Sequence, residues 1–465
     1  MIDGSSIDRV TAVLRERAQA LSAGARMPST RELTAQLAVS PVTLSRALAA
    51  LAGEGVLVTR PGSGTYVAER GPAADPLEDL SWQTLALGDR TVDASSVAFL
   101  LRGAEPGQLS LTGGYPNSSL LPGRALALAI ARAARRPDAA ERPPVAGIAP
   151  LREWFARQVA GTVSADDVLI TAGGQSALSA AFRAIAPSGS SVLVESPTYI
   201  GAIAVARAAR LNVIPVPTDE HGVRPDVLAE TLALTGARLF YCQPTYQNPT
   251  GTILAPDRRQ AVLEVARDAG AFVIEDDYAR WLGHGATAPP PLISEDSDGR
   301  VIYIGSLTKV LSPNMRVGAL IARGPVAERI RAHRVVDDFF VSRTLQEAAL
   351  ELLTAPAWRT HLTRLAAALS ERRTALLRAL ATTAPDLHLG VAPSGGLHLW
   401  VRLPDGIDDV ALAEHARAAG VLVSPGRPYH PAEPPAPHLR LSYAAAANTR
   451  ELATAVQRLA TAQRA

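Results

Sequence analysis

The 465-residue sequence contains a single lysine, Lys309, among 46 lysine and arginine residues, which leaves 45 arginines. Such a composition indicates that arginine has replaced lysine wherever either cation suffices. Arginine stays protonated at physiological pH, whereas a desolvated lysine amine can lose its proton and attack a carbonyl group. A lone lysine could also persist by chance on a solvated surface. The choice between these interpretations depends on the motifs around it.

Other residue types and patterns that are rare or missing in the sequence also exclude classes of protein. With one cysteine, Cys242, the chain can form no intramolecular disulfide, and the strand-like residues before it predict a buried structural thiol rather than a nucleophile. No apolar run approaches the roughly 18 residues that cross a bilayer, and the start, MIDGSSIDRV, lacks a secretion-signal pattern. Nine histidines show no metal-ligand spacing, and a net charge of +2 does not indicate nucleic-acid binding by the whole chain. We expect a soluble, cytoplasmic protein with no metal site.

Residues 1–69 predict a small DNA-binding domain. Three helical patterns, the second starting near Thr30 and the third at Ser40, precede two β-rich runs that are separated by Gly-Ser-Gly at 62–64. Serine and threonine favour helix N-caps, and glycines supply the positive φ of a tight hairpin. The short turn between the second and third helices, followed by a hairpin, predicts a winged helix-turn-helix.

The rest of the chain predicts a linker and an α/β domain. Residues 70–107 begin with a proline- and alanine-rich stretch typical of linkers. Over 108–465, strand-like runs such as DVLITA, SVLVES and AFVIEDD alternate with helical runs. This alternation predicts an α/β fold with a large mixed, mainly parallel sheet. A helical region followed by the strands GLHLWVRL and HLRLSYA predicts a smaller α/β lobe at roughly 345–465.

Two segments of this domain suit an aldehyde cofactor that carries a phosphate and a pyridine ring. In Asp167–Leu178 a strand ends in a glycine pair and a helix begins, so free backbone N–H groups face any anion there. In Ala271–Tyr278 a buried strand ends in carboxylates, at the place where α/β folds bind ligands. Packing alone can explain the glycines, and carboxylates at strand ends are more often helix caps or metal ligands.

Four motifs, in order along the chain, resemble those of the fold type I aminotransferases. They are YQNPTG at 246–251, EDDY at 275–278, SLTKVLSPNMRVG around Lys309, and LRLSYA at 439–444. They look like the family's Asn-Pro-x-Gly turn, aspartate–tyrosine pair, lysine segment and C-terminal arginine strand. Together with the N-terminal unit, the chain resembles the MocR subfamily of GntR-type bacterial regulators over nearly its whole length. The resemblance implies a domain of the aminotransferase type I fold that binds pyridoxal 5′-phosphate.

The resemblance also implies roles for individual residues. Lys309, the catalytic lysine of the family, would bind the cofactor covalently, and Asp276 would pair with its pyridine nitrogen. Asn248 and Tyr278 would bond its phenolic oxygen, and Tyr199 would stack on its ring unless it is simple core. The residues expected to hold the phosphate, unless the two hydroxyls act only as caps, are Gly174, Gln175, Ser306, Thr308 and Arg316.

One further role and two departures concern the ligand end of the site. Arg440 would clamp the carboxylate of an amino-acid effector, a planar bidentate task that suits arginine better than lysine. Where the family often has a tyrosine that reaches the partner subunit's cofactor, the sequence has Arg142. Arg142 could replace that phosphate contact, or the contact could be lost. Gly174 stands where relatives often have serine, which removes one phosphate hydroxyl.

The N-terminal unit resembles the GntR winged helix over residues 28–67. In such folds one helix enters the major groove with short polar side chains, and arginines bind phosphate or guanine. The DNA-binding candidates are Arg31, Ser40, Thr43, Ser45 and Arg46 on the helices and Arg60 and Gly64 on the wing. Arg31 and Arg46 could instead be ordinary solvated charges. Since basic residues are few, we expect moderate affinity from one unit and reliance on a homodimer.

These expectations favour a transcription regulator that binds DNA, pyridoxal phosphate and an amino acid or amine. The effector would act through its different affinities for two arrangements of the DNA-reading heads. The alternative is an active aminotransferase with an accessory DNA-binding domain, because every catalytic group is present, including Asn248, where many such regulators have an aromatic residue. Lys309 and Asp276 argue against a third interpretation, a dimerisation scaffold without cofactor.

Overall fold

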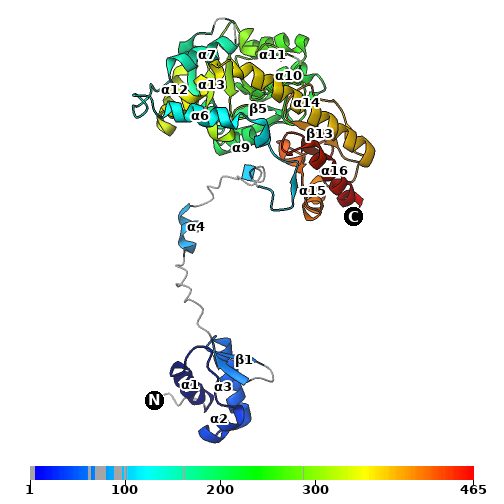
Figure 1. The fold of residues 1–465 in the computed structure, drawn as a ribbon. Helices are drawn as coiled ribbons and strands as arrows, with labels where there is room; N and C mark the ends of the chain where they lie inside the picture. Colours follow the sequence, from blue (N-terminus) through cyan, green and yellow to red (C-terminus); the bar gives the residue numbers. More distant parts are fainter. Residues whose placement is uncertain are drawn as a thin grey trace. The chain divides into compact units, whose positions relative to one another are not determined.

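The structure is a computed structural model, and it describes residues 6–60, 64–68, 80–87, 97–98, 101, 103–159, 161, 163–285 and 287–464. Internal contacts divide the chain into two compact units, Met1–Thr91 and Val92–Ala465, whose elements are labelled in Figure 1. The division falls within the segment 70–107 that was predicted as a linker. One short helix of that segment, α4 (Ser81–Leu87), belongs to the N-terminal unit.

The N-terminal unit combines three helices with a β-hairpin. Its elements are α1 (Ser6–Gln19), α2 (Thr30–Leu37), α3 (Pro41–Gly53), β1 (Leu57–Arg60) and β2 (Gly64–Val67). The two strands pair antiparallel, and the predicted turn residues 62 and 63 lie outside the described residues. The side chains of Ser29 and Ser40 cap α2 and α3, because each accepts a hydrogen bond from a backbone N–H of the helix that follows.

Buried leucines form the core of this unit. Leu14, Leu33, Leu44 and Leu51 come from the three helices and are fully buried. No single helix in the described part of the chain is long and apolar enough to cross a membrane. The helices α2 and α3 reach that length and composition only as a pair, bent by 113°.

The second unit, Val92–Ala465, is built on an eight-stranded sheet. In spatial order its strands are β4 (Val168–Thr171), β11 (Gly318–Ile321), β10 (Val301–Ser306), β9 (Phe272–Asp277), β8 (Leu239–Cys242), β5 (Ser191–Ser196), β6 (Asn212–Asp219) and β7 (Gly222–Val223). The strands from β10 to β6 run parallel, and β11 and β7 are antiparallel to their neighbours. The predicted mixed, mainly parallel sheet is confirmed.

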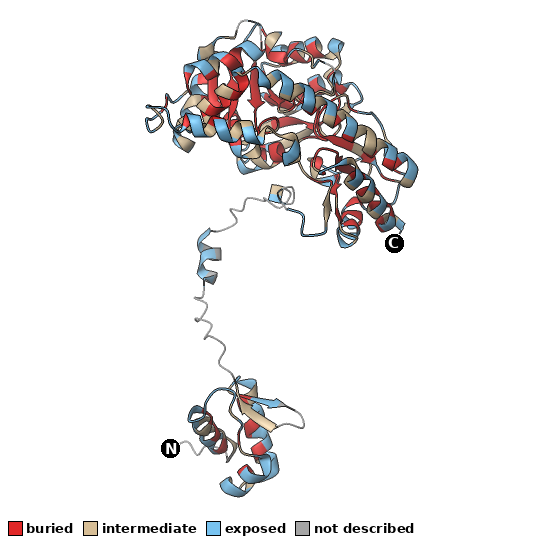
Figure 2. Ribbon diagram, in the orientation of Figure 1, coloured by how far each residue is buried: buried red, intermediate tan, exposed pale blue. Residues whose placement is uncertain are grey.

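Helices pack against this sheet (Figure 1), and most of its strands are buried (Figure 2), whereas β6 is only partly buried. The helices of the unit are α6 (Gly123–Ala133), α7 (Ala149–Val159), α8 (Gly174–Ile185), α9 (Ile200–Ala208), α10 (Pro225–Thr235), α11 (Pro256–Asp268), α12 (Pro325–Asp338), α13 (Arg343–Thr354), α14 (Ala357–Thr383), α15 (Asp409–Ala418) and α16 (Thr449–Arg464). Val273 and Val301 belong to one buried cluster, and their neighbours Ile274 and Ile302 belong to another. Successive residues of β9 and β10 therefore face opposite sides of the sheet.

A smaller antiparallel sheet forms the second lobe of this unit. Its strands, in spatial order, are β12 (His388–Leu389), β13 (His398–Arg402), β16 (His438–Ser442) and β15 (Ser424–Pro425). Beside it, β14 (Val421–Leu422) pairs in parallel with β3 (Leu109–Ser110). The start of the domain thus joins the smaller lobe, outside the range of roughly 345–465 predicted for it.

The parallel strands end at one edge of the large sheet. The segments that follow β10, β9, β8 and β5 carry Lys309, Tyr278, Asn248 and Tyr199, respectively. Ligands of α/β folds bind at the carboxyl ends of strands. Segments that are far apart in the sequence therefore meet where a ligand site is expected.

Candidate functional site

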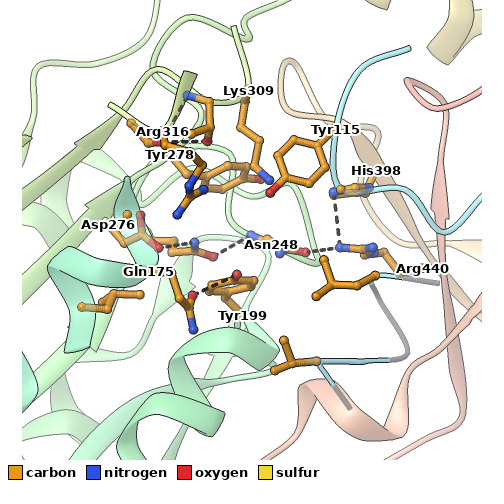
Figure 3. A pocket seen from close by; sticks show the side chains of 18 residues that line it. Tyr115, Gln175, Tyr199, Asn248, Asp276, Tyr278, Lys309, Arg316, His398 and Arg440 are labelled. Atoms are coloured by element: carbon orange, nitrogen blue, oxygen red, sulfur yellow. Dashed lines mark hydrogen bonds between the residues drawn. The ribbon is translucent and has the colours of Figure 1, made fainter. Parts of the chain in front are cut away.

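A pocket at this edge collects every residue that was predicted to hold the cofactor or an effector carboxylate (Figure 3). These residues are Gly174, Gln175, Tyr199, Asn248, Asp276, Tyr278, Ser306, Thr308, Lys309, Arg316 and Arg440. Arg440 comes from β16 in the smaller lobe and Lys309 follows β10 in the larger one. The pocket is therefore shared by the two lobes, and the role of each residue in it stays a prediction.

The Lys309 amine is held in an environment that disfavours its charge. Its Nζ lies 3.5 Å from the ring centre of Tyr115. Burial lowers the pKa of Lys309 to about 7, and the positive charges of Arg440 and Arg316 act in the same direction, whereas Asp276 opposes them. A substantial fraction of the amine is therefore neutral near pH 7, which is the form that attacks a carbonyl carbon.

Asp276 is a buried carboxylate held by two neutral donors. Tyr241 Oη donates to its Oδ2 at 2.7 Å, and Gln243 Nε2 donates to the same oxygen at 2.9 Å. Burial raises the pKa of Asp276 to about 6, although these two hydrogen bonds lower it. At neutral pH the group is still mostly anionic, as a partner for a protonated ring nitrogen has to be.

The carboxylates on either side of Asp276 have different partners. Glu275 accepts hydrogen bonds from the backbone N–H groups of Leu292 (2.8 Å) and Ile293 (3.0 Å), at the start of a short 3₁₀ helix, Leu292–Ser294. Asp277 accepts from Tyr303 Oη at 3.1 Å and pairs with Arg280. The helix-cap interpretation thus applies to Glu275. Because side chains alternate along β9, only Asp276 of the three faces the pocket.

The start of α8 forms an anion-binding corner of the pocket. Gly173 precedes the helix with φ 89°, a left-handed conformation that glycine adopts without strain. A Cβ at Gly173 would lie 3.1 Å from the guanidinium of Arg316, whose Nη2 donates to the Ala172 carbonyl at 2.7 Å. The first helical residues, Gly174 and Gln175, and the guanidinium therefore border the same space, and both favour an anion.

Two hydroxyls complete this corner. Ser306 Oγ and Thr308 Oγ1 are hydrogen-bonded to each other at 2.9 Å, and both side chains are buried. Ser306 Oγ also accepts from the backbone N–H of Thr308 at 3.3 Å. Ser306 thus closes a local turn after β10 rather than capping a helix, and both residues line the pocket.

Tyr199 lies across the pocket from Lys309 (Figure 3). Its hydroxyl donates to Gln175 Oε1 at 3.2 Å, and Gln175 Nε2 donates to the Gly201 carbonyl at 3.1 Å. A Cβ at Gly201 would lie 2.3 Å from the tyrosine ring. Glycine at position 201 therefore allows the ring to lie close to the backbone while it borders the pocket.

Asn248 and Tyr278 are already bonded within the protein. The backbone N–H of Asn248 donates to Gln243 Oε1 at 3.1 Å, and its Oδ1 accepts from Arg440 Nη1 at 3.1 Å. Tyr278 Oη donates to the Tyr246 carbonyl at 2.8 Å. These bonds hold both side chains at the pocket wall, and their contact with a phenolic oxygen stays a prediction.

Arg440 is almost completely buried, with 1% of its surface exposed. Its Nη1 donates to Asn248 and lies 3.3 Å from His398 Nε2, and its Nη2 donates to the Thr112 carbonyl at 2.6 Å. Since a guanidinium only donates, His398 accepts. Burial, with the charges of Arg440 and Lys309, holds the pKa of His398 well below its usual value. The Nε of Arg440 is buried without a hydrogen-bond partner among the described residues.

The predicted DNA-contacting residues lie mainly on the surface of the N-terminal unit. Arg31 on α2 and Ser45 and Arg46 on α3 are exposed. Ser40 is exposed as well, but its Oγ accepts from the N–H of Thr43 and contacts its hydroxyl at 2.8 Å. Ser40 and Thr43 therefore fix the start of α3, while Ser45 and Arg46 remain available to a partner.

The remaining predicted residues are two on the wing, Arg60 and Gly64, and Arg142 in the second unit. Gly64 opens β2 with φ 120°, and a Cβ there would lie 3.0 Å from Arg26 Nε. Arg60 ends β1, and its side chain lies outside the described part of the structure. Arg142 is exposed, and it does not line the pocket.

Comparison with known proteins assigns both units to families. Residues 112–459 match the model "Aminotransferase class I and II". Residues 7–67 match "Bacterial regulatory proteins, gntR family". The chain belongs to the class I and II aminotransferase family. Its N-terminal unit is a GntR-type helix-turn-helix domain, so the predicted resemblance to MocR-type regulators is confirmed.

Individual relatives include both enzymes and regulators. The 2-aminoadipate transaminase of Thermus thermophilus is 33% identical over 375 residues, which cover 79% of this chain and 94% of the relative. The HTH-type transcriptional regulator TauR of Rhodobacter capsulatus is 29% identical over 90% of this chain and 88% of its own. The crystal structure of LysN, an alpha-aminoadipate aminotransferase from Thermus thermophilus complexed with N-(5′-phosphopyridoxyl)-L-leucine, matches with a TM-score of 0.75 and 32% identity. The match covers 80% of this chain and 95% of that one.

Several pocket residues of this aminotransferase domain were not anticipated from the sequence. They are Val97, Leu101, Gly114, Tyr115, Leu178, Gln243 and His398. Two of them adjoin strands that the sequence does predict: Gln243 directly follows the run LFYC, and His398 begins the run HLWVR. No motif marked their side chains as facing the pocket. Cys242, predicted to be a structural thiol, is buried beside Gln243.

Proposed function

We propose that the protein is a transcription regulator that binds DNA through its N-terminal unit and binds pyridoxal 5′-phosphate, with an amino acid or amine, in its aminotransferase domain. One observation carries the proposal. A pocket that contains the only lysine of the chain, beside a buried carboxylate and a buried arginine, occurs together with a helix-turn-helix whose third helix exposes Ser45 and Arg46. A regulator needs both parts, whereas a transaminase needs only the first.

The pocket residues fit this cofactor chemically. The start of α8 and Arg316 suit a phosphate, Asp276 suits a protonated pyridine nitrogen, and the Lys309 amine suits an aldehyde. When bound, the cofactor supplies an aldehyde that reacts with amines and a ring that withdraws electrons. The buried Nε–H of Arg440 lacks an acceptor among the described residues, and a ligand carboxylate would satisfy it.

The wall of the pocket also includes two residues near the start of the second unit. Val97 and Leu101 line the pocket, and both precede the paired residues of β3. A ligand in the pocket is therefore expected to contact these two residues of the second unit. This supports a regulator in which the ligand acts on the connecting segment.

An active aminotransferase is the second candidate. The pocket retains Lys309, Asp276, Asn248 and Arg440 together, and a relative named as a transaminase is 33% identical over 94% of its own length. Sustained turnover of an amino donor with a keto acid would favour this candidate. Cofactor binding and DNA binding without turnover would favour the regulator.

We further propose that the protein acts as a homodimer in the cytoplasm. The N-terminal unit contains few basic residues, so one unit is expected to bind DNA only moderately, and two linked units raise the affinity through avidity. Analytical ultracentrifugation of the full chain, with and without operator DNA, tests the dimer.

Replacing Arg46 by alanine is expected to weaken binding to DNA from upstream of the protein's own gene. Arg46 is exposed on the helix expected in the major groove, and a contact from arginine to guanine or phosphate contributes roughly 1–3 kcal/mol, or about 5- to 150-fold in affinity. An electrophoretic mobility shift measures this. Arg9→Ala, an exposed arginine on α1, is the matched control. Equal binding by both variants and the wild type would argue against α3 as the DNA-reading helix.

Replacing Leu101 by glutamine is expected to reduce the effect of the ligand on DNA affinity. Leu101 lines the pocket although 71% of it is exposed, so the change should leave folding and cofactor binding nearly intact. We expect the ligand-dependent change in the DNA dissociation constant to shrink by roughly 2- to 30-fold. Leu87→Gln, in α4 and 68% exposed, is the control, and an effect of equal size there would count against a specific role for Leu101.

A further inference from the structure

Gln243 lines the pocket, and its backbone N–H and both polar atoms of its side chain have hydrogen-bond partners. It follows β8 and is 2% exposed. Its backbone N–H donates to Glu195 Oε2 at 3.0 Å, its Oε1 accepts from the backbone N–H of Asn248 at 3.1 Å, and its Nε2 donates to Asp276 Oδ2 at 2.9 Å. A single side chain thus connects the carboxylate of the pocket to the turn that carries Asn248.

The orientation of the Gln243 amide follows from these partners. A backbone N–H can only donate, so the oxygen of the amide must face Asn248 and the nitrogen must face Asp276. Tyr241 donates to the same Oδ2 of Asp276 at 2.7 Å. Two donors on one oxygen fix the plane of the carboxylate. Neither of these hydrogen bonds involves Oδ1.

We infer that Gln243 is a positioning residue for the cofactor: through Asp276, it sets the orientation and the negative charge of the carboxylate that would face the pyridine nitrogen. The inference rests on the cofactor binding of the proposed function. Removal of a neutral donor from a buried carboxylate raises its pKa, because burial is then opposed by fewer hydrogen bonds. Asp276 would become protonated at higher pH and would stabilise a protonated ring nitrogen less well.

Other groups around Asp276 titrate or carry charge, and the test has to separate them from Gln243. They are Glu195 on β5, Tyr199 before α9, Tyr241 on β8, Asp277 on β9, Tyr278 after β9 and Lys309 after β10. All of them are retained when only Gln243 is changed. We therefore compare the dissociation constant of the variant with that of the wild type at the same pH. The ratio of the two constants removes most of the effect that titration of these other groups has on binding.

Gln247 offers a matched control for loss of a buried glutamine. It is 3% exposed, lies in the same turn, and its Nε2 donates to the Pro197 carbonyl at 2.6 Å and to Glu195 Oε2 at 3.4 Å. Its Oε1 accepts from the backbone N–H and the hydroxyl of Thr250. None of these bonds involves Asp276, although the bond to Glu195 lowers the pKa of that carboxyl. Gln247→Met therefore removes similar bonds and leaves both hydrogen bonds to Asp276 in place.

The experiment measures the dissociation constant of pyridoxal phosphate for the full-length protein at pH 6.5 and pH 8.5, by absorbance and by quenching of tryptophan fluorescence. For Gln243→Met we expect binding about tenfold weaker than wild type at pH 6.5 and about threefold weaker or less at pH 8.5. Loss of the hydrogen bond raises the pKa of Asp276, so more of this carboxyl is protonated at pH 6.5, whereas at pH 8.5 it is mostly anionic. Gln243→Glu keeps the acceptor for Asn248 and, while protonated, a donor for Asp276. It should therefore restore binding at pH 6.5 to within about threefold of wild type.

Different results would contradict the positioning role of Gln243 and the cofactor binding itself. A loss of affinity in Gln243→Met that is equal at both pH values, or the same pH dependence in Gln247→Met, overturns the positioning role. Failure of Gln243→Glu to restore binding at pH 6.5 also overturns it. Absence of an absorbance band in the wild-type protein would instead remove the cofactor binding on which the inference rests.

Discussion

Replacement of Lys309 by alanine is expected to abolish covalent attachment of pyridoxal phosphate. Lys309 is the only lysine among the 465 residues, and its Nζ borders the pocket with a pKa lowered to about 7. In the wild type, borohydride reduction should fix the cofactor to a single lysine-containing peptide, and absorbance near the visible edge should accompany binding. Both signals should disappear in Lys309→Ala, to below about 1% of wild type, because no arginine supplies a neutral amine.

The pH dependence of attachment gives a second test of Lys309. Because its pKa is lowered, the neutral amine becomes the main form above about pH 7 instead of only near the ordinary value of about 10.4. We expect the attachment rate to rise about tenfold between pH 6 and pH 7.5 and then to level off. Lys309→Arg is the control, since it keeps the positive charge but not the deprotonated amine. A covalent adduct in either variant, or a rate that rises steadily to pH 10, would contradict the assignment.

The main elements of the fold follow from local patterns, and the exceptions have identifiable causes. The buried strands β5, β9 and β10 each contain a continuous apolar run, as parallel strands covered on both faces require. One strand that was not predicted is β6 (Asn212–Asp219), which contains Pro215 and Pro217. In the structure β6 pairs with β5 along its length, but on its other side β7 pairs only with Thr218 and Asp219. The prolines therefore stand where no ladder hydrogen bond is needed.

The association of β3 with the smaller lobe could not be read from the sequence. Leu109 and Ser110 pair with Val421 and Leu422, more than 300 positions away in the chain, and Leu111 N–H donates to the Leu422 carbonyl at 2.8 Å. A strand of two residues has no periodicity of its own. Its position depends on the tertiary fold alone.

In the pocket, the residues carried by motifs were predictable and those that support them were not. The turn YQNPTG and the strand end EDDY each mark a backbone geometry that recurs, so Asn248 and Asp276 could be placed in advance. The amide of Gln243 and the ring of His398 depend on partners that are brought near by other strands, namely Asp276 on β9 and Arg440 on β16. A hydrogen bond between strands that are distant in the sequence leaves no local signal.

Replacement of Arg440 by leucine is expected to weaken binding of a carboxylate ligand by about 30-fold or more. Loss of one member of a buried, hydrogen-bonded charged pair costs roughly 2–5 kcal/mol. The guanidinium is 1% exposed and has a buried Nε without a partner among the described residues, so the donor is in place for a carboxylate. Isothermal titration of amino acids into the cofactor-loaded protein measures the change. Arg402→Leu, on the neighbouring strand β13 and more than half exposed at its side chain, is the matched control.

Arg440→Leu should also change the pKa of Lys309. This second effect distinguishes a direct electrostatic role of Arg440 from a general disturbance of the fold. The charge of Arg440 lowers the pKa of Lys309, second only to burial among the causes. Its removal should therefore raise that pKa, and the pH midpoint of cofactor attachment should move upward. Arg402→Leu should leave the midpoint in place. If Arg440→Leu loses carboxylate affinity with an unchanged midpoint, Arg440 binds the ligand but does not prepare the amine. If it loses neither, the carboxylate site lies elsewhere in the pocket.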